Sequence, residues 1–222
     1  MFAPGSVLLH DTLAPAGENL LFSAPRDILV AHDAAAVHAA LHRLESARAA
    51  GLHAAGFLAY ELGFVFEERL AHLLPPPGAT PLLWLGLYGA PERLTAAEVD
   101  ARLAAMGGAG SARDIVPRMD EAAYGRAFDA VKALISAGDT YQVNLTFKAG
   151  FRLDGDPVAL YRELVAKQPV AYGALINTGE QWILSRSPEL FVSSRDDTLS
   201  ARPMKGTLKR GRTLAEDEAG RA

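Results

Sequence analysis

The sequence predicts an α+β protein whose strands pair antiparallel. Short apolar runs of strand length alternate with amphipathic stretches of helical period along the 222 residues. Several neighbouring runs are joined by only three or four residues of turn-forming type, such as 177–180 and 195–197, and short joints favour hairpins over parallel crossovers. Half of the residues are hydrophobic, so the chain is long enough and apolar enough for one large domain or two small ones.

The first half of the chain contains four apolar runs that read as strands. Residues 20–23 and 28–31 predict two short strands separated by the turn composition Pro-Arg-Asp at 25–27. The runs at 56–60 and 82–88 are apolar enough to predict buried strands.

Two helices in this half have clear start signals. Asp33 precedes a stretch with apolar residues at helical spacing and is a suitable N-cap, and Gly51 is suited to end that helix. Thr95 and Glu98 have capping-box spacing, which predicts a helix that begins there and runs to about Met106.

The glycine-rich stretch at 107–111 is the most flexible composition in the chain and predicts a domain boundary. We therefore expect an N-terminal domain over residues 1–112 and a second domain over residues 113–222.

The second half has stronger local signals. Asp120 is a predicted N-cap, and Gly138 is the residue type best suited to a left-handed C-cap of the same helix. Residues 141–148 alternate strictly between apolar and polar, which predicts a strand. Asp156, followed by a proline, predicts the start of a further helix that Pro169 stops.

Composition limits the classes of function. The net charge of −4 argues against nucleic acid as a main partner, and the longest apolar runs have strand length, which argues against a membrane protein. The chain has no cysteine, so disulfides, thiolate metal sites and cysteine nucleophiles are excluded. The N-terminus lacks the pattern of a signal peptide, so a cytoplasmic location is expected.

Lys205 lies between Pro203 and Gly206 and is surrounded by other cations, including Arg202. A proline and a glycine at these positions favour a defined bend. Neighbouring positive charge and burial both favour the neutral amine, which is the nucleophilic form of lysine. A solvated basic turn is the alternative interpretation.

Three segments together resemble the chorismate-utilising enzymes, and most closely the component I subunits of aminodeoxychorismate synthase. They read AGDTYQVNL at 137–145, SRSPELF at 185–191 and ARPMKGT at 201–207. The family shows A-G-D-x-Y-Q-V-N-L, then S-P-E-x-F, then P-x-K-G-T, in the same order. Each segment alone is a weak signal, and the combination is specific.

The resemblance implies layered antiparallel β-sheets with outer helices, an anthranilate synthase component I-like fold, and a catalytic domain that is incomplete here. In that family the second domain is roughly twice as long as residues 113–222. The resemblance also implies Mg²⁺, with its glutamate ligands in the missing C-terminal half. The chain therefore resembles an amino-terminal fragment that we expect to be inactive alone.

The resemblance also implies roles for two catalytic residues. Lys205 matches the lysine that attacks the substrate ring and expels the 4-hydroxyl before ammonia displaces it, whereas anthranilate synthases carry alanine there. Glu189 matches the general acid that protonates the departing hydroxyl, a role that requires a carboxyl pKa raised by a desolvated pocket. Because 16 residues and one predicted turn separate them, we expect both at the same end of a hairpin.

Four further residues are candidates for binding the substrate. Gln142 occupies the position where isochorismate and salicylate synthases have a water-activating lysine, and an amide cannot act as that base. Asn144 shares its predicted strand face and either lines the same cleft or is a plain sheet-surface amide. Arg202 either attracts the dianionic substrate or is an ordinary surface cation, and Thr207 closes the P-x-K-G-T motif.

The function that follows from the resemblance is conversion of chorismate and ammonia to 4-amino-4-deoxychorismate for p-aminobenzoate and folate synthesis. The ammonia would come from a glutamine amidotransferase subunit. Two alternatives stay open at this point: anthranilate synthase component I or another chorismate-utilising enzyme, and a binding module without turnover.

Overall fold

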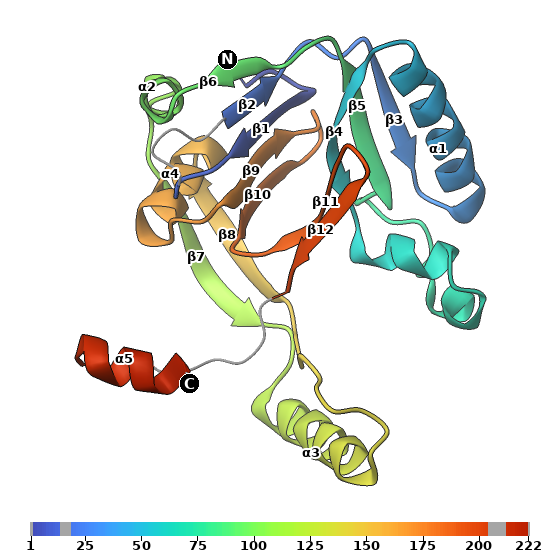
Figure 1. The fold of residues 1–222 in the computed structure, drawn as a ribbon, viewed down its shortest axis with the longest axis vertical. Helices are drawn as coiled ribbons and strands as arrows, with labels where there is room; N and C mark the ends of the chain where they lie inside the picture. The colour runs from blue at the N-terminus through green and yellow to red at the C-terminus, as the bar shows by residue number, and fades with distance from the viewer. Residues whose placement is uncertain (1, 14–18, 204–211, 222) are drawn as a thin grey trace.

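The computed structural model describes residues 2–13, 19–203 and 212–221, and it is mixed α and β with antiparallel sheets, as predicted (Figure 1). The largest sheet has five strands in the order β10 (Trp182–Ser187), β9 (Tyr172–Asn177), β1 (Ser6–His10), β2 (Asn19–Phe22) and β6 (Glu92–Leu94). A second sheet has the order β3 (Asp27–Ala31), β5 (Leu83–Tyr88) and β4 (His53–Leu58).

The two sheets share a buried core. Val7 and Ile176 of the five-stranded sheet pack in one cluster with Trp84 and Tyr88 of the three-stranded sheet. The hydroxyl of Tyr88 donates a hydrogen bond of 2.7 Å to the carbonyl oxygen of Gly5, so its one polar atom is satisfied. Burial raises the pKa of Tyr88 to about 12.

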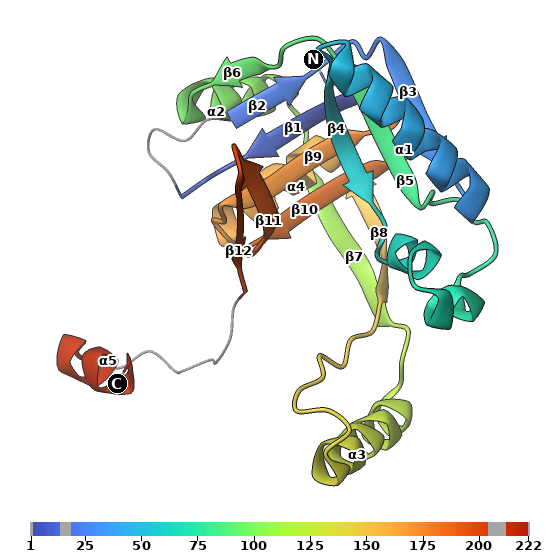
Figure 2. The same cartoon turned by 45° about the vertical axis from the view of Figure 1, so that its right-hand side comes forward.

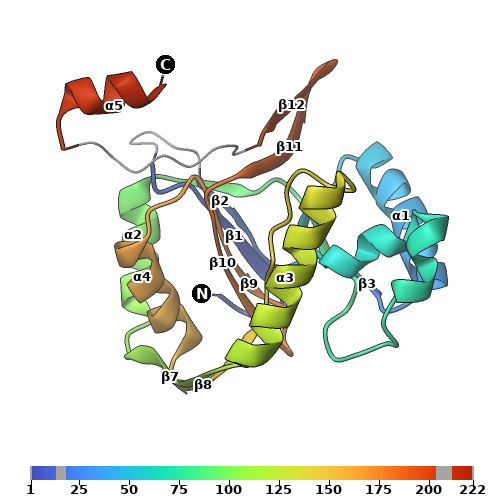
Figure 3. The ribbon, with the colours of Figure 1, turned by 90° about the horizontal axis from the view of Figure 1, so that it is seen from below.

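Helices cover the sheets on their other faces. Two of them, α2 (Ala96–Ala105) and α4 (Pro157–Lys167), pack side by side on the five-stranded sheet through a cluster that includes Leu103 and Tyr161 (Figure 3). On the three-stranded sheet lies α1 (Ala34–Ala49), with Val37 in the cluster beneath it (Figure 2). The result is a helix, sheet, sheet, helix order of layers, so layered antiparallel sheets with outer helices are confirmed.

The predicted caps are present at the helix ends. The carboxylates of Asp33, Asp120 and Asp156 each accept hydrogen bonds from backbone N–H groups in the first turn of the following helix. Thr95 and Glu98 form the reciprocal capping box. Helix α3 (Glu121–Ala137) ends at Gly138, which has the left-handed backbone conformation with φ of 82°. Glycine is the residue that adopts this conformation at little cost.

The remaining elements extend from the layers. A two-stranded ribbon of β7 (Gly110–Pro117) and β8 (Ala149–Gly155) leads to α3, which buries none of its residues among those described. Two short 3₁₀ helices, η1 (Tyr60–Val65) and η2 (Glu68–Leu73), follow β4, and α5 (Leu214–Arg221) ends the chain. No helix within the described ranges is long and apolar enough to cross a membrane.

One strand prediction is wrong, and another has shifted bounds. Residues 141–148 form no strand, because their alternating pattern has no partner strand in the described structure. The strand predicted at 56–60 lies instead at His53–Leu58, and only Ala55 in it is buried. The domain boundary at residue 112 stays a prediction, and the five-stranded sheet takes strands from both sides of it.

Candidate active site

The hairpin of β11 (Leu190–Arg195) and β12 (Thr198–Arg202) adjoins the candidate acid at one end of its sequence. Glu189 precedes β11, and Pro203, which begins the motif that contains Lys205, follows β12. The turn of the hairpin contains Asp196 in the left-handed region, with φ of 52°, a conformation that aspartate tolerates better than most residues. The ladder begins with Arg195 opposite Thr198 and ends with Leu190 opposite Arg202. The hairpin predicted around residues 195–197 is therefore confirmed.

Glu189 lies between the five-stranded sheet and this hairpin. It follows Ser187, the last residue of β10, and Pro188. The backbone N–H of Glu189 donates to Ser187 Oγ at 3.2 Å, and the same hydroxyl donates to the Glu189 carbonyl oxygen at 3.1 Å. These two bonds, together with the fixed φ of Pro188, hold the backbone of Glu189 at the start of β11.

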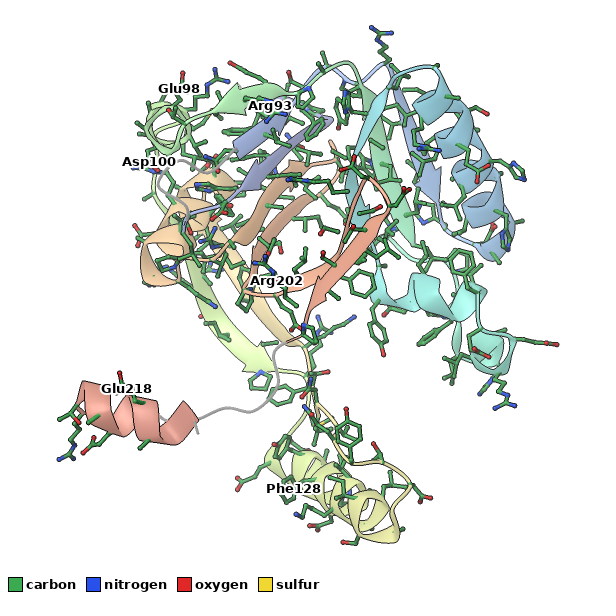
Figure 4. All side chains as sticks on the ribbon, in the orientation of Figure 1. Arg93, Glu98, Asp100, Phe128, Arg202 and Glu218 are labelled. Atoms are coloured by element: carbon green, nitrogen blue, oxygen red, sulfur yellow. The ribbon has the colours of Figure 1, made fainter. Side chains whose placement is uncertain are left out.

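A surface hollow of about 510 Å³ lies where the two arms of the hairpin end. Figure 4 shows Arg202 at this end of the hairpin. The hollow is lined by residues of both arms and of the preceding strand end: Ser187, Glu189, Leu190, Phe191, Ala201 and Pro203. A carboxylate therefore borders a partly apolar hollow, an arrangement that suits a substrate that carries a ring.

The side chain of Glu189 is exposed among the described residues. A general acid that works near neutral pH requires a desolvated carboxyl group. The desolvation would therefore have to come from the substrate or from parts of the protein outside the described residues.

Lys205 and Thr207 lie outside the described residues, which end at Pro203 and resume at residue 212. The expected approach of Lys205 to Glu189 on one concave surface thus stays a prediction. In the described structure Glu189 directly precedes Leu190, and Leu190 pairs with Arg202 across the hairpin.

Gln142 and Asn144 are exposed in the irregular segment between α3 and β8, not on a strand. The prediction that they share a strand face is wrong, because this segment joins no sheet. One of its apolar residues contacts α3 instead: the rings of Phe147 and Tyr124 meet edge to face with centroids 6.0 Å apart. The described structure does not place the two amides on the hairpin that carries Glu189.

A polar cluster that sequence reasoning missed lies next to this site. Arg186 precedes Ser187 on β10, and its guanidinium donates to the hydroxyl of Tyr161 on α4 at 3.3 Å. The Nδ1 atom of buried His10 lies 3.2 Å from the same hydroxyl. The available signal was a charged residue, Arg186, in a run of strand composition directly before Ser-Pro-Glu.

The environment of this cluster shifts two pKa values. Burial raises the pKa of Tyr161, and the hydrogen bond and charge of Arg186 partly oppose that shift. Burial and the charge of Arg186 lower the pKa of His10, against opposing contributions from Asp100 and Asp11. Because Tyr161 accepts a hydrogen bond from Arg186, its own O–H can donate to His10 in the tautomer that leaves Nδ1 unprotonated, and donors and acceptors then alternate from Arg186 to His10.

In the described ranges, no three histidine, aspartate or glutamate side chains gather closely enough to hold a metal ion. The Mg²⁺ that the resemblance implies, with ligands outside this sequence, stays a prediction, and the chemistry proposed below uses no step through a metal.

The model of the chorismate binding enzyme family matches residues 12–222. The chain therefore belongs to the chorismate binding enzyme family.

Individual relatives include two kinds of synthase. The aminodeoxychorismate synthase component 1 of Bacillus subtilis is 37% identical over 99 residues, which cover 45% of this chain and 21% of that protein. The aminodeoxychorismate synthase of Streptomyces griseus is 38% identical over 46% of this chain and 14% of its own length. The anthranilate synthase component 1 of Cereibacter sphaeroides is 39% identical over 43% and 19%. The chain thus covers about a fifth or less of these relatives.

Proposed function

We propose that the protein contributes to an aminodeoxychorismate synthase, which converts chorismate and ammonia to 4-amino-4-deoxychorismate and water. The observation that carries the proposal is the hairpin that follows Glu189 and leads, through Arg202, into the sequence segment that contains Lys205. Membership of the chorismate binding enzyme family and the similarity to aminodeoxychorismate synthases support it.

The proposed chemistry has two displacements. In the first, the neutral amine of Lys205 forms a C–N bond to the substrate ring, the C–O bond at position 4 breaks, and Glu189 protonates the departing hydroxyl, so water leaves. In the second, ammonia forms a C–N bond at position 4 and the bond to Lys205 breaks. The lysine is regenerated, and a proton returns to Glu189.

Arg202 has a binding role in this proposal. Its guanidinium is permanently charged and has a planar set of donors that matches a carboxylate, and chorismate carries two carboxylates. Thr207, Gln142 and Asn144 stay predicted binding residues. A glutamine amidotransferase subunit as the source of ammonia, and Mg²⁺ held by residues outside this sequence, likewise stay predictions.

The test uses the full-length protein that contains this sequence, supplied with chorismate, ammonium and Mg²⁺, with products separated by chromatography. We expect 4-amino-4-deoxychorismate from the wild type, and loss of nearly all of it from Lys205→Ala and Glu189→Gln. Arg195→Gln, at the far end of the same hairpin, is the matched control and should retain activity. Anthranilate as the main wild-type product would overturn the proposal.

Anthranilate synthesis is the second candidate, because an anthranilate synthase component 1 is as similar to this chain as the aminodeoxychorismate synthases are. Lys205 argues against it, since the resemblance assigns alanine to that position in anthranilate synthases. A module that binds chorismate without turnover is the third. It predicts saturable binding of chorismate by calorimetry and no product of either kind.

A further inference from the structure

Arg186 links two separate segments of the chain, the residues after β1 and helix α4 with its end, to the end of β10. Its Nε and Nη2 atoms donate to the carbonyl oxygen of Gln168 at 3.2 and 2.7 Å. Nη2 also donates to Thr12 Oγ1 at 3.1 Å, and the guanidinium carbon lies 5.6 Å from the centre of the Tyr161 ring. Thr12 follows β1, Gln168 follows α4, and Tyr161 lies on α4. A single side chain therefore connects the sheet to the helix that covers it.

The neighbouring strand leaves room for this side chain. Gly173 on β9 is the register partner of Arg186. A Cβ atom added to Gly173 would lie 2.5 Å from Arg186 Nη1 and 2.8 Å from the carbonyl oxygen of His10. Such distances are too short for real contacts, so a glycine is required for the guanidinium to cross β9 and reach its partners.

The chain leaves the central sheet directly after this anchored residue. Ser187 is the last residue of β10, and Leu190 starts a separate two-stranded sheet. The Ser187 hydroxyl holds the backbone of Glu189 through the two hydrogen bonds described above. The direction in which Glu189 and its hairpin leave the core is therefore set at a strand end that Arg186 fixes.

We propose that Arg186 is a positioning residue for Glu189, a role that rests on the proposed function of Glu189 as the general acid. Arg186 does not line the hollow and acts only through Ser187 and the strand end. The planar guanidinium uses Nε, Nη1 and Nη2 at once, which the single ammonium of lysine cannot reproduce. A small displacement of an acid is enough to reduce turnover strongly, by up to about 100-fold for a shift of about 1 Å.

The first experiment measures kinetics in the full-length protein. Arg186→Gln should lower kcat by about 10- to 100-fold while KM for chorismate stays within about twofold, because substrate contacts remain and the acid is displaced. Arg186→Lys should recover part of that loss. Arg152→Gln, which removes an exposed arginine of β8 that pairs with Asp114, is the control and should behave as wild type.

A double-mutant cycle separates positioning from general stabilisation. If Arg186 acts through Glu189, then Arg186→Gln should cause little further loss of kcat in the Glu189→Gln background. Losses that multiply in the double variant would overturn the inference.

Amide hydrogen exchange provides a readout that does not depend on activity. In Arg186→Gln, the amides of residues 187–191 should exchange at least about tenfold faster, while the β1 and β9 amides keep their wild-type rates. Unchanged exchange at 187–191, or equal acceleration throughout the five-stranded sheet, would overturn the inference. A wild-type protein that forms no aminodeoxychorismate refutes the proposed function alone, and the exchange result still decides whether Arg186 fixes this corner.

Discussion

Leu190 and Arg202 are opposite one another at the open end of the β11–β12 hairpin. The residue before Leu190 is Glu189, and the residue after Arg202 is Pro203, so both arms meet at the same hollow. Two strands that pair are about 4.8 Å apart, which keeps the backbones of the two arms close at this point. The register therefore brings a candidate acid and a candidate carboxylate-binding cation to one edge.

Substitution of Arg202 tests its proposed role as the cation that binds a carboxylate of the substrate. In the full-length protein, Arg202→Gln should raise KM for chorismate about tenfold, since a charge-assisted hydrogen bond contributes about 1.5–3 kcal/mol. Arg195→Gln removes a cation from the same hairpin at its turn end and should leave KM unchanged. Steady-state kinetics at two salt concentrations checks this result, and equal KM values for Arg202→Gln and wild type would assign Arg202 to the solvated surface.

Local signals in the sequence predicted the helices well. Asp33, Asp120 and Asp156 are caps whose effect is confined to the next few residues, so a short window of sequence contains all the information. The hairpin around Asp196 is local in the same sense.

The parts that were missed depend on distant residues. Strand β1 is central in the five-stranded sheet because it pairs with β2 and with β9, and the second of these lies more than 160 positions away along the chain. Residues 141–148 have a strand pattern without a partner strand in the described structure, since alternation alone does not supply the hydrogen bonds that a strand needs. Arg186 was missed because its partners, Thr12, Tyr161 and Gln168, come together only in the folded chain.

Stability should fall below neutral pH because of His10. Its pKa is lowered in the native state by burial and by Arg186, against opposing contributions from Asp100 and Asp11, whereas unfolded histidine titrates near 6.5. Between the native pKa and about 6.5 the unfolded chain binds more protons, so the free energy of unfolding decreases as pH falls through this window. The contribution of His10 to the free energy of unfolding is fully present above about pH 6.5. Because one proton is involved, this free energy changes by at most about 1.4 kcal/mol per pH unit.

Denaturant unfolding from pH 7.5 to 5 measures this contribution. His10→Gln should flatten the pH dependence in that range, whereas His42→Gln, at an exposed position on α1, should leave it as in wild type. If the wild-type and His10→Gln curves run parallel, then His10 is not the titrating group.

Two glycines should respond to alanine in opposite directions. At Gly110 a Cβ atom would lie 2.3 Å from the carbonyl oxygen of Asp156 and 2.5 Å from the backbone nitrogen of Leu160, at the packed start of α4. Gly110→Ala should therefore destabilise the protein by about 1–3 kcal/mol. Gly125, in the middle of α3, has no atom within 4 Å of its added Cβ, so Gly125→Ala should stabilise α3 by about 0.5–1 kcal/mol.

Thermal unfolding compares the two glycine variants under one condition. The melting temperature should fall in Gly110→Ala, while helix content measured by circular dichroism should persist to higher temperature in Gly125→Ala. A Gly110→Ala variant as stable as wild type would show that the start of β7 does not pack on α4 in this way.

The apolar stripe of α3 should make this 222-residue chain bind hydrophobic probes. Tyr124 and Phe128 stack with ring centroids 6.4 Å apart, yet they are 39% and 46% exposed, and Figure 4 shows Phe128 on the helix that extends from the layers. Aromatic surface of this kind on several adjacent residues favours association.

Phe128→Ser removes a large ring from the stripe while leaving the polar face of α3 intact. We expect the variant to bind less of a fluorescent hydrophobic dye and to sediment with less self-association at high protein concentration than the wild-type chain. Lys132→Ser, an exposed position on the same helix, is the control and should bind dye as the wild type does, because the stripe is retained. Equal dye binding by wild type and Phe128→Ser would contradict this prediction, because it would show that the apolar side of α3 is covered in solution.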